Sequence, residues 1–242
     1  MMGFLQAIIC IGIRLNPPIL KSPKHKSDHL IFFVLMVMVI FFHEKRLYPF
    51  QWNWYRNLFV NIPLAIACIM VRKIVQNIVA YQEGDMELKI NNSKIWNPFL
   101  MIDWIGFLPF VFLGFGWAKP INSSKATSGN KRWTRFHIIG SGLLANLFLA
   151  LLFKTIYHPA ELISLNLAIT LDAFAKMNMN YFLFSLLPIP PLDGWLLFKT
   201  FQKTKVKLAT EEIYGYSLLL VIYFTNFQNL IKPISQFLLK WF

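Results

Sequence analysis

Residues 186–194 read Leu186-Leu187-Pro188-Ile189-Pro190-Pro191-Leu192-Asp193-Gly194, and this run is the strongest indication of the fold. An apolar stretch precedes the run, and Trp195-Leu196-Leu197-Phe198 follows it. The three prolines end any helix at this point and free backbone carbonyls. An ionisable side chain at membrane depth is costly, so Asp193 is a candidate functional residue. The alternative is a proline-rich turn in which Asp193 caps the next helix.

The composition indicates an integral membrane protein. Hydrophobic residues make up 56% of the 242 positions and charged residues only 14%, whereas an average soluble domain carries roughly 25% charged residues. The net charge of +13 does not indicate a nucleic-acid partner, because the cations lie in short loops between apolar segments. There they set topology and meet anionic lipid, so the lipid bilayer is the expected partner.

Six apolar stretches predict an all-α integral membrane protein with about six transmembrane or re-entrant segments. They cover residues 30–42, 58–81, 99–115, 136–157, 162–187 and 213–231. Asp103 and Pro109 interrupt the third stretch, so it is a candidate for a re-entrant segment. In the fifth, Asp172 and Lys176 have the i,i+4 spacing of a local ion pair. If two spans separate them, the basic loops 116–135 and 199–207 share one side, which the positive-inside rule makes cytoplasmic. The basic N-terminal linker favours the opposite orientation.

The stretch from Ser185 to Gly194 resembles a signature of the site-2 protease family of intramembrane zinc metallopeptidases. In that family the Asp of this signature supplies the third zinc ligand, which corresponds to Asp193, and Ser185 occupies a position where the family has Asn. The resemblance covers roughly residues 58–200, and Leu143 stands where the family usually has Pro. The further matches, in order, are Gly84-Asp85, Asn97-Pro98, Ile102-Asp103 with Gly106, Gly116-Trp117-Ala118-Lys119-Pro120 and Gly142-Leu143-Leu144-Ala145-Asn146-Leu147.

The resemblance implies a His-Glu-x-x-His motif, in which two His side chains hold zinc and the Glu acts as general base. The second His of the family typically precedes the Gly-Asp pair by eight residues, and counting back from Gly84 leads to Gln76. The first His and the Glu then correspond to Arg72 and Lys73. All three catalytic side chains are therefore missing, and two are replaced by cations that repel Zn²⁺.

Other histidines do not supply the motif. His43-Glu44 begins like it, but Leu47 stands at the position of the second His. His25 and His29 have i,i+4 spacing, but lysines surround them and no Glu follows the first. His137 and His158 have no ligand-spaced neighbour. No metal site and no cofactor are therefore expected, and zinc is expected only if the chain is an active protease.

Without zinc, Asp193 would be an unpaired carboxylate in a low-dielectric place. We therefore predict that Arg72, or Lys73 on the adjacent face, forms an ion pair with Asp193, and that Gln76 donates a further hydrogen bond. Cationic groups well over about 6 Å from Asp193 would contradict this prediction. The alternative is that Arg72 and Lys73 reach to the membrane interface and Asp193 only caps a helix.

The resemblance also marks a former substrate groove, formed by Asn146, Ser185, Pro188, Pro190 and Pro191. The resemblance implies that the position of Ser185 contacts the substrate backbone, so the replacement of Asn there further weakens the case for proteolysis. Asn146 is more typical of a hydrogen bond between helices than of a catalytic group.

The sequence thus predicts three parts: residues 1–57 as an N-terminal membrane-associated extension, 58–200 as a site-2-protease-like core, and 201–242 as a charged loop with a C-terminal transmembrane segment. The expected function is that of a catalytically inactive pseudoprotease in the bacterial cytoplasmic membrane, which binds or regulates a membrane partner through that partner's transmembrane helix. The alternatives are an active intramembrane zinc metalloprotease with a divergent metal site, and a small transporter or accessory subunit.

Overall fold

The computed structural model describes residues 53–85, 101–113, 116–120, 131–201 and 228–241, together with positions 215, 218, 219 and 222. All regular structure within these residues is helical, which confirms the predicted all-α class for this part of the chain. The helices are α3 (Asn53–Gln82), α6 (Trp104–Leu113), α7 (Lys131–Glu161), α8 (Leu165–Ser185), α9 (Asp193–Phe201) and α11 (Gln228–Lys240).

Two of the described helices are long and apolar enough to cross a membrane. These candidate spans are Val60–Gln82 in α3, with 23 residues, and Arg132–Glu161 in α7, with 30 residues. A helix needs about 20 apolar residues to cross the hydrocarbon core of a bilayer. The second and fourth predicted segments therefore correspond to candidate spans, and membrane association is supported.

The third and fifth predicted segments form helices of a different kind. Among its described residues, the third contains α6, whose ten residues reach about 15 Å, half of the hydrocarbon thickness. The fifth forms α8, which is long enough at 21 residues but carries Asp172, Lys176 and three asparagines. Six spans are accordingly not confirmed among the described residues. The first segment and most of the sixth lie outside these residues, and the predicted domain boundaries remain predictions.

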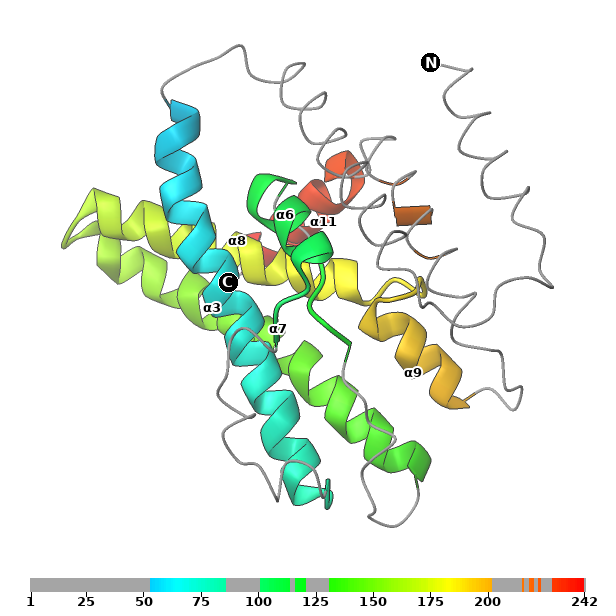
Figure 1. Ribbon diagram of the computed structural model, residues 1–242. Coiled ribbons are helices and arrows are strands. Elements are labelled where there is room, and N and C mark those ends of the chain that lie inside the picture. The colour runs from blue at the N-terminus through cyan, green and yellow to red at the C-terminus, as the bar shows by residue number, and fades with distance from the viewer. Residues whose placement is uncertain are drawn as a thin grey trace, which may run out of the picture.

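Helices α7 and α8 form a long antiparallel hairpin, and α3 crosses it (Figure 1). Only residues 162–164 separate α7 from α8, and such a short connection places two helices side by side. Helix α9 packs against α7, and α11 packs against α8. The hairpin is therefore the scaffold on which the shorter helices are placed.

The main hydrophobic core lies between α3, α6 and α8. Cys68 and Ile69 of α3 are fully buried there, with Phe110 of α6 and Tyr181 of α8. The rings of Phe110 and Tyr181 lie 4.7 Å apart, a spacing typical of aromatic pairs. This core brings the middle of α3 close to the C-terminal half of α8, where the proline-rich motif begins.

Candidate functional site

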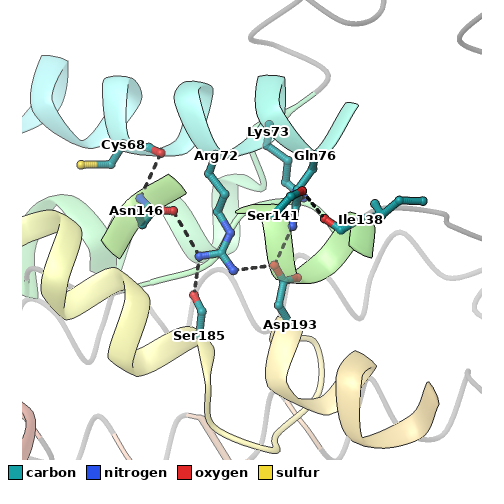
Figure 2. Close-up of polar contacts among 9 residues, drawn as sticks. All are labelled: Cys68, Arg72, Lys73, Gln76, Ile138, Ser141, Asn146, Ser185 and Asp193. Atoms are coloured by element: carbon teal, nitrogen blue, oxygen red, sulfur yellow. Dashed lines mark hydrogen bonds and ion pairs between the residues drawn. The ribbon is translucent and has the colours of Figure 1, made fainter. Parts of the chain in front are cut away.

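Arg72 is the centre of a buried polar network that joins four helices. Its side chain extends from α3 into the space between the end of α8 and the start of α9 (Figure 2). Its Nη2 lies 2.5 Å from Oδ2 of Asp193. Its Nη1 donates to Oγ of Ser185 at 2.9 Å and to Oδ1 of Asn146 in α7 at 3.5 Å. The predicted ion pair with Asp193 is therefore present, with Arg72 as the cation.

Gln76 and Lys73 complete the surroundings of Asp193. Gln76, one helical turn after Arg72, donates from Nε2 to Oδ2 of Asp193 at 2.9 Å, as predicted. Its Oε1 accepts a hydrogen bond of 3.0 Å from Nζ of Lys73. Lys73 is buried and attracts Asp193 through space, while its hydrogen bond goes to Gln76. One carboxylate oxygen is thus held by both a guanidinium and an amide.

Two glycines permit the close approach of the helices around this network. A Cβ atom at Gly142 of α7 would lie 2.5 Å from Nε2 of Gln76, so a larger residue there would displace the Gln76 side chain. A Cβ atom at Gly194 would lie 2.2 Å from the carbonyl oxygen of Leu186 and 2.6 Å from that of Leu187. The Asp-Gly pair thus allows α9 to begin directly against the end of α8.

The proline-rich loop returns the chain so that Asp193 faces the end of α8. Helix α8 ends at Ser185, and the loop has tight turns in which Ile189 N donates to Leu187 O and Leu192 N to Ile189 O, each at 2.8 Å. The Pro190–Pro191 peptide bond is cis. Pro188 is exposed, Pro190 is half-buried and Pro191 is buried. Ser185 and Asp193, eight residues apart, therefore both contact Arg72.

Asn146 forms the hydrogen bonds between helices that the sequence favours. It donates to Oδ1 of Asn178 in α8 at 2.9 Å and to the carbonyl oxygen of Cys68 in α3 at 3.4 Å. Asn146 and Ser185 are both buried. These two positions of the predicted substrate groove thus serve the Arg72 network in the described structure.

Sequence reasoning missed the role of Tyr181. The Arg72 guanidinium carbon lies 4.5 Å from the centre of the Tyr181 ring, which is the geometry of a cation–π contact. Tyr181 is one aromatic residue among many in the sequence, so no local pattern distinguishes it. Its contact with Arg72 becomes visible only when α3 and α8 are packed together.

Asp103 holds a polar turn next to the site. Its carboxylate accepts hydrogen bonds from the Ile105 amide at 3.1 Å and from Nε1 of Trp117 at 2.9 Å. The indole of Trp117 is buried and lies at a small cavity of about 10 Å³, which has room for about one water molecule. The cavity is lined by Arg72, Lys73, Trp117, Ala118, Tyr181, Ser185, Pro191, Leu192 and Asp193.

The cations determine the ionisation of Asp193, which lies outside the two candidate spans. Burial acts to raise the pKa of its carboxyl group. Attraction to Arg72 and Lys73, together with the hydrogen bonds from Arg72 and Gln76, outweighs burial and holds this pKa below its ordinary value. Asp193 is therefore a paired carboxylate at neutral pH.

The arrangement does not fit a zinc ion. A catalytic zinc needs about three protein ligands at roughly 2.0–2.3 Å, and Arg72 already contacts Oδ2 of Asp193 with a positive charge. In the part of the chain that the structure describes, no three His, Cys, Asp or Glu side chains form a group able to hold a metal. His137 and His158 pair with Glu83 and Glu161 instead. His25, His29 and His43 lie outside the described residues.

The chain is 29% identical over 170 residues to a Bacillus subtilis (strain 168) protein named "Putative zinc metalloprotease YwhC". The matched stretch covers 66% of this chain and 78% of that protein. No protein-family profile matches the chain, and no solved structure matches it. The likeness supports the site-2-protease-like relationship that the motifs indicate.

Proposed function

We propose that this chain is a catalytically inactive, site-2-protease-like protein of the bacterial cytoplasmic membrane, and that it acts by binding a membrane partner. Its polar centre would stabilise the helix bundle where a protease would hold its metal. The observation that carries the proposal is the ion pair of 2.5 Å between Arg72 and Asp193, at the positions that the resemblance assigns to zinc ligands.

Three features support the loss of catalysis. Arg72, Lys73 and Gln76 stand at the three positions where the family has its His, Glu and His. The acceptor groups of Asn146 and Ser185 are engaged by Arg72. The small cavity at these residues, about 10 Å³, has room for about one water molecule.

Metal analysis of the purified full-length chain tests the proposal against active proteolysis, which the relative's name favours. We expect far less than one zinc ion per chain after purification with zinc in the growth medium. We also expect no cleavage of a transmembrane peptide substrate. Stoichiometric zinc that is lost in Asp193→Ala would overturn the proposal and indicate a divergent metal site.

A triple variant sharpens this test. Arg72→His, Lys73→Glu and Gln76→His together restore the His-Glu-x-x-His pattern opposite Asp193. Because two imidazoles and one carboxylate are a common catalytic zinc set, we expect the variant to retain about one zinc per chain. The same triple variant with Asp193→Ala is the matched control and should lose the metal. Zinc binding that is unaffected by Asp193→Ala would show that these residues do not share one site.

The proposed binding of a membrane partner rests on an exposed apolar stripe along α7. Leu144, Phe148, Leu152 and Ile156 recur at every fourth position, and all four are exposed. Such a stripe lies on one face of a helix. Gly140, one turn before it, has open space where a Cβ atom would stand, and small residues let transmembrane helices approach closely. A transmembrane helix of another protein is the proposed occupant.

Site-specific photo-crosslinking tests the proposed binding of a transmembrane helix to this stripe. A photoreactive phenylalanine analogue at Phe148 should give one discrete protein adduct in native membranes. The same group at Phe237 of α11, which is equally exposed, is the matched control and should not give that adduct. If neither position, or both positions equally, captured the protein, the stripe would be a lipid-facing surface only.

A further inference from the structure

Aromatic side chains gather where α7 begins and α9 ends. The rings of Trp133 and Phe136 lie 5.8 Å apart, and those of Phe136 and Phe201 lie 5.9 Å apart. Trp133 is 55% exposed and Phe201 is 54% exposed, so the cluster is not part of the core. Trp rings with one apolar and one polar edge favour the level of the lipid headgroups. The cluster therefore has the character of a membrane-interface belt.

Positive charge accompanies the rings. Arg132 is exposed and Arg135 is half-exposed on the first turns of α7, and Lys199 is half-exposed on α9. Residues 116–135 and 199–207 contain five and four Lys or Arg residues, respectively, and no Asp or Glu. Glu83 is a described carboxylate at this end, and it contacts His137 at 3.0 Å and Thr134 at 3.1 Å. The described residues of this surface thus include three cations, Arg132, Arg135 and Lys199, beside Glu83.

The position of the cluster along α7 agrees with the thickness of a bilayer. At the other end of the helix, Nζ of Lys154 lies 4.5 Å from the centre of the Tyr157 ring and 3.5 Å from Oδ1 of Asp172. Phe136 and Lys154 are separated by 18 residues, which is about 27 Å of helix. The hydrocarbon core measures about 30 Å, so Phe136 and Lys154 lie near its two edges when α7 crosses it.

We propose that Trp133, Phe136, Phe201 and the cations Arg132 and Arg135 form a docking surface for anionic phospholipid. The rings would enter the headgroup layer beside the end of α7, and the guanidinium groups would pair with lipid phosphates. Charge complementarity selects anionic lipid over a neutral one. The surface lies away from the Arg72–Asp193 site, and the inference does not depend on the absence of catalysis.

Lipid retention by the full-length chain provides the first test. After purification from a detergent mixture with equal phosphatidylglycerol and phosphatidylcholine, native mass spectrometry should show preferential retention of phosphatidylglycerol. Arg132→Gln with Arg135→Gln should lower that preference by about tenfold, because each cation near a membrane surface contributes to anionic-lipid attraction. Lys154→Gln with Lys176→Gln removes the same charge at the opposite end and is the matched control.

Equal losses in the two double variants, or no preference in the unaltered chain, would overturn the proposal. A second measurement does not depend on folding of the charge variants. Spin labels at Trp133→Cys and at Phe148→Cys, in a chain without Cys10 and Cys68, report depth in phosphatidylglycerol-containing nanodiscs through oxygen and nickel-chelate accessibility. The label at 133 should lie at headgroup level and the label at 148 in the hydrocarbon. A label at 133 in bulk water would contradict the proposal.

Discussion

Asp193 and Asp172 are two paired carboxylates with opposite surroundings. The side chain of Asp193 is 9% exposed and pairs with Arg72, which is 121 residues away in the chain. The side chain of Asp172 is 20% exposed and pairs with Lys176, four residues on, and with Lys154 at 3.5 Å. A local pair near the surface contributes little, whereas a buried pair makes each partner strongly dependent on the other. We therefore expect Asp193 to contribute much more than Asp172 to the stability of the helix bundle.

Removal of Arg72 should have the largest effect. Arg72→Met leaves Asp193 buried without a cation, and breaking a buried pair in this way costs about 3–5 kcal/mol. Denaturant titration of the full-length chain in micelles measures the free energy of unfolding. Asp172→Asn is the matched control at the less buried pair and should change this free energy by less than about 1 kcal/mol. Similar losses of unfolding free energy in Arg72→Met and Asp172→Asn would show that the two ion pairs do not differ in their contribution to stability.

Neutralisation of Asp193 should lower the free energy of unfolding by less than removal of Arg72 does, and the loss should depend on pH. Asp193→Asn leaves Arg72 with Ser185 and Asn146 as acceptors, so we expect a loss of about 2 kcal/mol at neutral pH. The folded-state pKa of Asp193 is lowered. Its stabilising contribution is therefore full above the ordinary pKa of 3.8 and declines as the pH falls through the folded value. The difference between the unaltered chain and Asp193→Asn should shrink below about pH 3.8 and stay constant above it. A difference that grew on acidification would contradict the ion pair.

Replacement of both Arg72 and Asp193 by apolar residues should recover most of the stability that is lost when Arg72 alone is replaced. Arg72→Met combined with Asp193→Leu removes the charges together, and apolar replacement of a buried pair is often nearly neutral. The double variant should unfold within about 1–2 kcal/mol of the unaltered chain, because Ser185, Asn146 and Gln76 lose a partner. A double-mutant cycle gives the coupling energy. Additive losses would indicate that Arg72 and Asp193 stabilise the bundle independently.

The smallest effect should come from the local pair. Lys176→Ala removes one cation from Asp172 while Lys154 remains, so we expect a change below about 0.5 kcal/mol. The same denaturant titration detects it, and added salt should reduce it further. A loss of several kcal/mol would mean that Asp172 lies in a much less polar environment than its exposure indicates.

Local patterns predicted much of the scaffold. The apolar stretches 58–81 and 136–157 correspond to the candidate spans of α3 and α7, and the i,i+4 spacing of Asp172 and Lys176 corresponds to an ion pair. Stretches such as 99–115 were less informative, because apolar composition does not distinguish a spanning helix from the short helix α6. The length and hydropathy of a segment depend only on residues that are neighbours in the sequence, so the sequence alone predicts them.

The sequence by itself predicted that Asp193 needs a partner, and it placed the cations Arg72 and Lys73 where the resemblance implies a zinc ligand and a general base. Only the tertiary structure decided that Arg72 forms the ion pair, that Lys73 donates to Gln76, and that Tyr181 stacks against the guanidinium. The physical reason is the rotation and separation of the packed helices. Arg72 and Lys73 are adjacent on α3, so which of them faces Asp193 depends on how α3 is rotated against α7 and α8. A local sequence pattern does not determine this rotation.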